Sequence, residues 1–129
     1  MGLHPKKIEN ILKLDSFSRY KYFLKKVADF ECFWSIMDKN EEYVISNIEN
    51  NQLISFWSND SFIKVNSKAM WQNCTPVKID LDNFEDVLIP LIKRHNLLIN
   101  VFPVNHKSGF VVNIDEFIRD LNDELEFYI

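Results

Sequence analysis

The chain has 129 residues, 47% of them hydrophobic and 14% aromatic, a composition that excludes an intrinsically disordered protein. Its formal net charge is −4, and its two glycines are too few for the glycine-rich loops that hold phosphates in P-loop and dinucleotide-binding proteins. We expect a single domain over residues 1–129, because chains of this length commonly form one core.

Apolar residues at helical spacing open the chain. They predict a short helix over 5–14 and a longer helix that is capped by Asp15 or Ser16 and ends near residue 29. The runs that follow are rich in β-branched and aromatic residues and cover 33–37, 43–46 and 53–57. Because short polar turns join antiparallel neighbours, these runs predict a three-stranded meander over residues 33–57.

The middle of the chain alternates between helix and strand. A helix is expected after residues 58–60, a strand over 76–81, and a second helix opened by a capping box of Asp82 and Glu85. Pro90 lies inside that helical pattern, where its ring and its missing N–H must kink or split the helix.

Two strands and a helix complete the pattern. Asn96 is expected to stop the preceding helix in the left-handed conformation, and apolar strands follow over 97–102 and 110–112. Asn113 and Glu116 form a second capping box, which opens the last helix. The order ααβββαβαββα predicts an α+β domain, with a mainly antiparallel mixed sheet of five or six strands covered by helices.

Several segments together resemble a known bacterial family. Residues 19–29 (RYKYFLKKVAD), followed by Trp34, are similar to the opening of the family called domain of unknown function 2750. The other similar segments are Trp57 at the end of the third strand, 81–84, 88–91 and 101–103. One departure is Ser58, which stands where the family usually has proline. The family has no assigned activity, so the resemblance supports the fold but supplies no catalytic residues.

No catalytic or metal-binding motif stands out. The histidines are His4, His95 and His106, and none has an acid or a thiol at the spacing of a metal site. Cys74 could meet His95 or His106 only through the fold, and its local sequence lacks the signature of a catalytic thiol. We therefore predict no catalytic, cofactor-binding or metal-binding residues, and expect Cys32 and Cys74 to be reduced and not bonded to each other.

Charge is distributed unevenly along the chain. Residues 1–28 contain seven Lys and Arg, whereas residues 113–129 contain six Asp and Glu. On the last helix the acidic side is expected to face outward, opposite an apolar side formed by Phe117, Leu121 and Leu125. A solvated helix face is the simplest explanation, and a docking surface for a basic partner is the alternative. The candidate partner-binding residues are Asp120, Asp123, Glu124, Phe127, Tyr128 and Trp71.

Binding another protein is the function that these observations favour. Small acidic α+β domains recur among bacterial immunity proteins, so the lead hypothesis is an immunity- or antitoxin-type inhibitor that neutralises a basic toxin domain by binding it. The alternative is a housekeeping protein, such as a small enzyme whose site is built from unrecognised polar residues.

Other classes of partner have less support in the sequence. The basic residues of the second helix that could contact phosphates are Arg19, Lys21, Lys25 and Lys26. The net acidity and the core spacing of the aromatic residues argue against a nucleic-acid partner. Neither a signal peptide nor a membrane span is apparent, so we expect a cytoplasmic protein with no membrane partner.

Overall fold

The computed structural model of the chain describes residues 3–64, 73–104 and 108–127. The helical elements are α1 (Pro5–Leu12), α2 (Ser16–Phe30), α4 (Leu81–Asn83), the π-helix η1 (Phe84–Leu88), α5 (Ile89–Arg94) and α6 (Ile114–Glu126). The strands are β1 (Cys32–Met37), β2 (Ile45–Ile48), β3 (Asn51–Phe56), β4 (Thr75–Asp80), β5 (Leu98–Val101) and β6 (Phe110–Val112). Residues 60–64 are also helical, and the rest of the helix predicted there lies outside the described residues. The α+β class is confirmed.

The N-terminal helices begin where their sequences predict, and α1 ends two residues before the predicted position 14. Pro5 occupies the first turn of α1, where a missing N–H costs nothing. Asp15 caps α2, because its Oδ1 accepts the backbone N–H of Ser18 at 2.7 Å. At the other end Glu31 adopts a left-handed conformation, and its N–H donates to the carbonyl of Val27.

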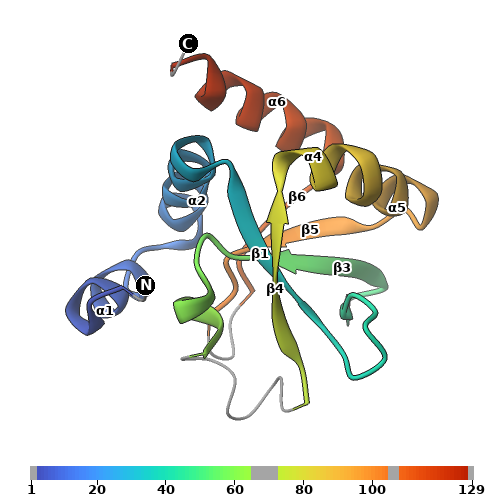
Figure 1. The fold of residues 1–129 in the computed structure, drawn as a ribbon, viewed down its shortest axis with the longest axis horizontal. Coiled ribbons are helices and arrows are strands. Elements are labelled where there is room, and N and C mark those ends of the chain that lie inside the picture. The colour runs from blue at the N-terminus through green and yellow to red at the C-terminus, as the bar shows by residue number, and fades with distance from the viewer. Residues whose placement is uncertain (1–2, 65–72, 105–107, 128–129) are drawn as a thin grey trace.

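Among the described residues, the strands form one sheet of order β1–β4 and another of order β2–β3–β5–β6. β3 and β5 pair in parallel, and the remaining ladders are antiparallel. The prediction of mixed, mainly antiparallel pairing is therefore confirmed, but the described strands form two sheets rather than the expected single sheet of five or six strands. Figure 1 shows β1 and β4 crossing the strands of the larger sheet.

The predicted meander over residues 33–57 is wrong in its first strand. β2 and β3 form the expected hairpin, but β1 forms its ladder with β4. Single bridges join β1 to the residues on either side of the hairpin, at Met37–Tyr43 and at Trp34–Trp57. Asp38 makes the local turn by accepting the N–H groups of residues 40 and 42, so the chain does reverse there. Turn chemistry fixes such a reversal, but it does not fix how far the ladder continues.

The helical segment after β4 starts earlier than predicted. Asp80 rather than Asp82 is the cap, since its Oδ1 accepts the N–H of the residue three positions later at 2.7 Å. The helix then widens into a π-turn, in which the N–H of Ile89 donates to the carbonyl of Phe84. Ile89 begins α5, and Pro90 is its second residue. Helical conformation continues without a gap from Leu81 to Arg94, so the helix is not split at this proline, and the π-turn lies directly before it.

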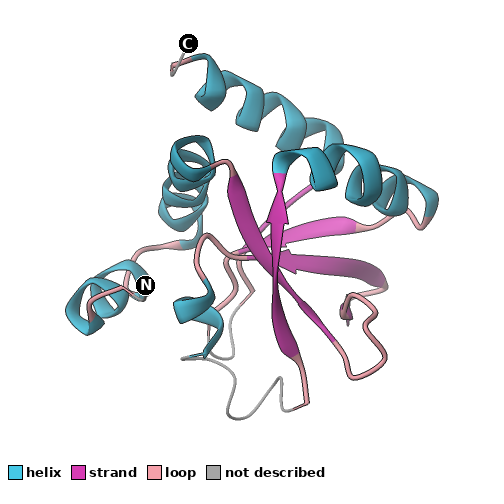
Figure 2. Ribbon diagram, in the orientation of Figure 1, coloured by secondary structure: helices cyan, strands magenta, loops and turns pink. Residues whose placement is uncertain are grey.

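Phenylalanine rings from five elements meet in the core. Phe33 of β1 lies 4.6 Å from Phe56 of β3 and 5.7 Å from Phe23 of α2, measured between ring centroids. It also lies 5.5 Å from Phe84 of η1 and 6.5 Å from Phe117 of α6. These separations are those of favourable edge-to-face and tilted ring pairs. One cluster thus joins both sheets to the helices that Figure 2 shows around them.

The chain turns sharply where β5 ends. Phe102 is fully buried and has a positive φ of 62°, which is uncommon for a bulky residue. Its N–H donates to the carbonyl of Phe56 at 2.8 Å, and its carbonyl accepts the Nε–H of Arg19 at 3.2 Å. Trp57 donates its Nε1–H to the next carbonyl, that of Pro103, at 3.0 Å. Arg19 and Trp57, both in segments that resemble the family, therefore bind adjacent carbonyls of one backbone turn, which we call the Phe102 corner.

Candidate functional site

The last helix presents the residues predicted to bind a partner. Asn113 caps α6, because its side-chain oxygen accepts the N–H of Glu116 at 2.8 Å, as the sequence predicts. Phe117 and Leu121 are buried, and Leu125 is partly buried against the core. The apolar side of α6 therefore packs inward, and the acidic side is left facing α2 and solvent.

Asp120 does not point freely outward. Its Oδ2 accepts the hydroxyl of Tyr20 at 2.7 Å, and Tyr20 is only 2% exposed. The ring of Tyr20 also stacks on Phe110, with centroids 4.7 Å apart. Burial, and then the neighbouring Asp120 carboxylate, raise the pKa of Tyr20 well above its usual range, so its phenol stays protonated as a donor. Asp120 is thus a structural tie between α2 and α6, which corrects the prediction that it faces outward.

Asp123 and Glu124 belong to a groove between α2 and α6. The groove has a volume of about 250 Å³, and Phe17, Lys21 and Leu24 of α2 form its opposite wall. Asp123 is exposed and Glu124 is partly exposed. Within the described ranges, neither carboxylate forms an ion pair. We call this surface the α2–α6 groove.

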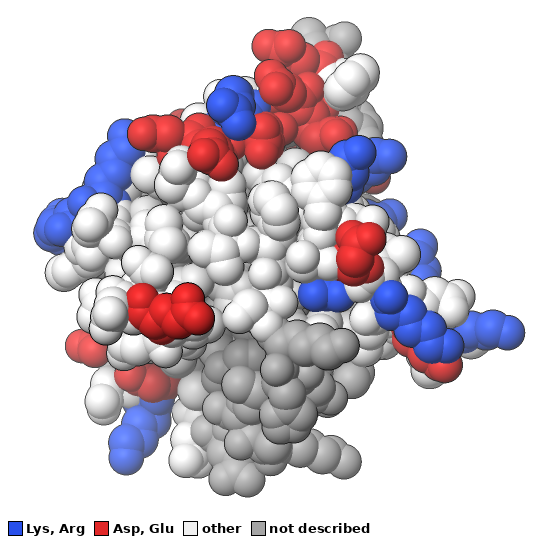
Figure 3. Space-filling view, turned by 180° about the vertical axis from the view of Figure 1, so that it is seen from behind, with Lys and Arg blue, Asp and Glu red and all other residues white. Residues whose placement is uncertain are grey.

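Exposed aromatic side chains flank the acidic residues. Phe17 is 51% exposed and Phe127 is 82% exposed. Lys21 holds its ammonium group 5.2 Å from the centroid of the Phe17 ring. Figure 3 shows the acidic side chains gathered along α6, with basic side chains on the adjoining edge of the molecule. The groove and its border therefore combine two carboxylates outside any ion pair of the described chain with exposed apolar rings, the mixture found at protein interfaces.

Two of the predicted partner-binding residues, Trp71 and Tyr128, lie outside the described residues. Conversely, Phe17 is not among the residues predicted to bind a partner, and the structure leaves it half exposed at the start of α2. The available signal was position: Phe17 is in the first turn, one turn before the core contacts of Tyr20 begin.

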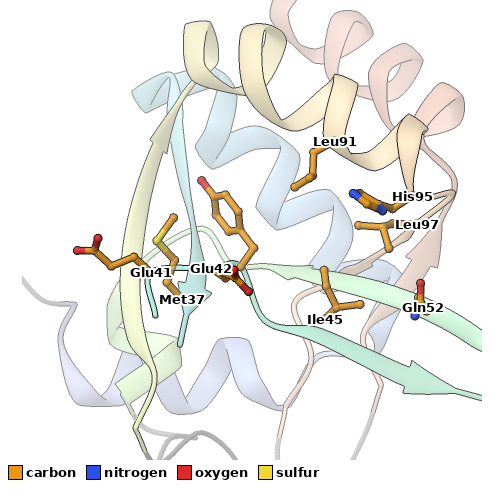
Figure 4. Close-up of a pocket in the computed structure, with 9 residues that line it drawn as sticks. Met37, Glu41, Glu42, Ile45, Gln52, Leu91, His95 and Leu97 are labelled. Carbon is orange, nitrogen blue, oxygen red and sulfur yellow. The ribbon is translucent and has the colours of Figure 1, made fainter. Parts of the chain in front are cut away.

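A second hollow contains a histidine. Its volume is about 550 Å³, and the residues lining it come from the 37–45 turn, β3 and the end of α5. Figure 4 shows His95 at the end of α5 and Glu41 directed away from the cavity. In the described part of the chain no hydrogen bond joins His95 to Glu42. Burial raises the pKa of Tyr43, which also lines the hollow, so its phenol stays protonated. The hollow therefore brings an imidazole and carboxylates to one region without forming an acid–base pair.

The cysteines and the predicted basic face complete the comparison with expectation. Cys32 and Cys74 are unbonded, and burial raises the pKa of the Cys74 thiol, which disfavours the nucleophilic thiolate. Arg19, predicted on the solvent side of α2, is instead 5% exposed, and burial lowers its pKa. Its guanidinium donates to the carbonyls of Leu14 and Phe102, so it is unavailable to phosphates.

Two further features are absent from the described residues. No group of three or more histidine, cysteine, aspartate or glutamate side chains there is placed to hold a metal ion. No helix in that part of the chain has both the length and the apolar character needed to cross a membrane.

Comparison with known proteins identifies the family. The pattern of the family described as protein of unknown function (DUF2750) matches residues 20–121. The chain belongs to this family. None of the curated proteins matches it. The match includes Tyr20 and Asp120, whereas Asp123, Glu124 and Phe127 lie beyond it.

Proposed function

We propose that this DUF2750 chain is a protein-binding domain of the immunity type, which neutralises a basic toxin domain by binding it at the α2–α6 groove. One observation carries the proposal: two carboxylates and two exposed aromatic rings occur on the same surface. The carboxylates, Asp123 and Glu124, have no ion-pair partner in the described chain, and the rings are those of Phe17 and Phe127. An exposed ring has an apolar face that a partner can cover, and the carboxylates attract lysine and arginine during encounter.

The fold makes this surface suitable for rapid docking. Phe23, Phe117 and their neighbours pack the two helices against one core, and the Tyr20–Asp120 hydrogen bond joins the helices directly. The groove is therefore rigid before a partner arrives, which reduces the entropy lost on association. Its acidic wall lies on α6, where the negative charges of the domain are concentrated.

The enzyme alternative has weaker support. It would use the hollow near His95, where the volume suits a small molecule but no acid–base pair is formed among the described residues. A specific activity abolished by His95→Ala, with folding unchanged, would favour it over the binding role.

The test requires a partner protein, which can be captured from the source organism with the tagged chain and then purified. The informative variant is Asp123→Lys with Glu124→Lys, and its matched control is Asp82→Lys with Asp86→Lys. The control residues are also exposed and lie at the start of the α4–η1 segment, and both variants change the net charge equally.

The expected result is a groove variant that associates at least about tenfold more slowly at low ionic strength, with a weaker salt dependence. The control variant should associate at the wild-type rate. Phe17→Ala should mainly speed dissociation, because it removes a contact rather than a steering charge. Equal association rates for the two charge variants would show that the partner docks elsewhere, and a partner whose activity is unaffected by binding would contradict the inhibitor role.

A further inference from the structure

A different hollow, of about 650 Å³, lies between α1, α2, β1 and β4, the helices and strands at the left and centre of Figure 1. This volume is within the range of small-molecule sites. The residues on which the argument depends are Lys7, Lys26, Lys78, Tyr22, Phe30 and Trp34. We call it the lysine groove.

The fold brings its three lysines together from separate elements. Lys7 comes from α1, Lys26 from α2 and Lys78 from β4. In the described chain none of them forms an ion pair, and no Asp or Glu lines the groove. The chain as a whole carries a net charge of −4, so this local excess of positive charge does not follow from composition. Uncompensated ammonium groups in a concave surface attract an anion.

Aromatic rings border the same space. The ammonium group of Lys26 lies 5.6 Å from the centroid of the Tyr22 ring and 5.9 Å from that of Phe30. Phe30 is 68% exposed at the end of α2, and Trp34 is partly buried. The groove therefore offers flat apolar faces next to its cations, the combination used to stack the bases of nucleic acids.

The remaining polar groups favour a ligand rich in acceptors. Asn59 already uses its Oδ1 to accept the N–H of Ser61 at 2.9 Å, which leaves its amide N–H groups to donate. The Oγ of Ser58 is shielded from solvent and has no hydrogen-bond partner in the described part of the chain. A buried hydroxyl without a partner is costly, and rotation of the Ser58 side chain towards the groove would let a ligand oxygen accept its hydrogen.

We propose that the lysine groove binds a nucleotide, with its phosphate on the three lysines and its base against the exposed rings. A phosphate places up to two negative charges and several acceptor oxygens on one group. The attached base supplies the flat surface that the rings match. An acidic peptide would supply the charge but no planar group beside it, so it fits the groove less well.

The sequence alone predicted no nucleic-acid partner. That expectation considered the second helix by itself, where Arg19 is now seen to be buried and Lys21 lies beside Phe17. The groove draws its cations from residues 71 positions apart, and only the folded chain shows them together. Free nucleotides and single-stranded nucleic acid share this chemistry, and binding measurements separate the two.

The test is isothermal titration calorimetry of the full chain with four probes. The probes are ATP, inorganic phosphate, a short single-stranded oligodeoxynucleotide and a short glutamate-rich peptide. The groove variant is Lys7→Gln, Lys26→Gln and Lys78→Gln. The matched control, which removes the same charge from exposed lysines outside the groove, is Lys25→Gln, Lys39→Gln and Lys93→Gln. Phe30→Ala removes one exposed ring, and circular dichroism checks that each variant is folded.

The proposal predicts that ATP, the oligonucleotide or both bind the wild-type chain. The groove variant should bind at least about tenfold more weakly, since it loses charged hydrogen bonds, and the control variant should bind within about twofold of wild type. Phe30→Ala should weaken nucleotide binding about fivefold or more and leave phosphate binding unchanged. Tighter binding of the oligonucleotide than of ATP identifies a single strand as the ligand, and the reverse identifies a free nucleotide.

Four results would overturn the proposal. The first is that neither ATP nor the oligonucleotide binds, and the second is that the groove and control variants lose the same affinity. The third is nucleotide binding that is no tighter than phosphate binding and is unaffected by Phe30→Ala. The fourth is tighter binding of the glutamate-rich peptide than of either nucleotide probe. The last result would assign the groove to an acidic protein.

Discussion

Replacing Asp120 with alanine should destabilise the fold, whereas the same change at Asp123, one turn further along α6, should not. The two acids belong to the same charged side of the helix in sequence. The structure separates them, because Asp120 accepts the Tyr20 hydroxyl at 2.7 Å while Asp123 is exposed and unpaired within the described residues. Comparing the two variants therefore distinguishes a structural acid from an available one.

The size of the effect follows from burial. A hydrogen bond to a charged group contributes about 1.5–3 kcal/mol when its loss leaves a buried partner unsatisfied. Tyr20 is 2% exposed, but the side chain of Asp120 is 30% exposed, so water can partly replace what is lost. We expect Asp120→Ala to lower the free energy of unfolding by about 1–2 kcal/mol, less than the loss of a fully buried pair would cost. For a domain of this size the melting temperature should fall by about 3–8 °C.

Urea denaturation followed by circular dichroism and tryptophan fluorescence measures the difference. Asp123→Ala should change the free energy of unfolding by no more than about 0.5 kcal/mol. Tyr20→Phe supplies the second arm of a double-mutant cycle with Asp120→Ala, and the coupling energy should be about 1 kcal/mol. Equal stabilities of the Asp120 and Asp123 variants, or strictly additive effects in the cycle, would refute the assignment of Asp120 as a tie between the helices.

Three further substitutions test other parts of the structure. Arg19→Lys should lower the free energy of unfolding by about 2 kcal/mol in urea denaturation. One ammonium group cannot replace a guanidinium that donates in two directions, one of them to the carbonyl of Phe102. A change within error would contradict the stabilising role of Arg19 at the Phe102 corner. Gly109→Ala should cost more than about 2 kcal/mol in the same assay, since a Cβ there would lie 2.0 Å from the carbonyl oxygen of Val101, and wild-type stability would contradict that close approach. The capping hydrogen bond lowers the pKa of Asp15, so the carboxylate contributes stability above its unfolded-state pKa, and that stability is lost as the pH falls through the folded-state pKa. Asp15→Asn, an uncharged cap, should therefore flatten the acid side of a profile of melting temperature against pH, and an unchanged profile would contradict this.

Much of the local structure could be predicted from the sequence. The caps at Asp15 and Asn113 and the left-handed stop at Asn96 follow from the chemistry of a few neighbouring residues, and all three are confirmed. The pairing of β1 could not be predicted in the same way. Its partner β4 is separated from it by the β2–β3 hairpin and the segment after it, and strand pairing over that distance is decided by the core.

The candidate sites show the same division. Helical spacing correctly placed the acidic side of α6 opposite its apolar side, but spacing gives a direction and not a depth. Asp120 is held in place because its carboxylate accepts the hydroxyl of Tyr20, which lies 100 positions earlier in the chain. The lysine groove depends on Lys7 and Lys78 meeting Lys26, and no local pattern indicates that meeting.

The Phe102 corner has a consequence for how the chain is made. Arg19 belongs to an early helix, yet the carbonyl that its Nε–H reaches lies 83 residues further on. On the ribosome, α2 therefore emerges long before β5 and α6 exist, and until then the Nε–H of Arg19 and the hydroxyl of Tyr20 lack their partners. Contacts that span so much of the chain close late, and they close together. The contacts of α2 with β5 and α6 can therefore form only after most of the domain has left the exit tunnel.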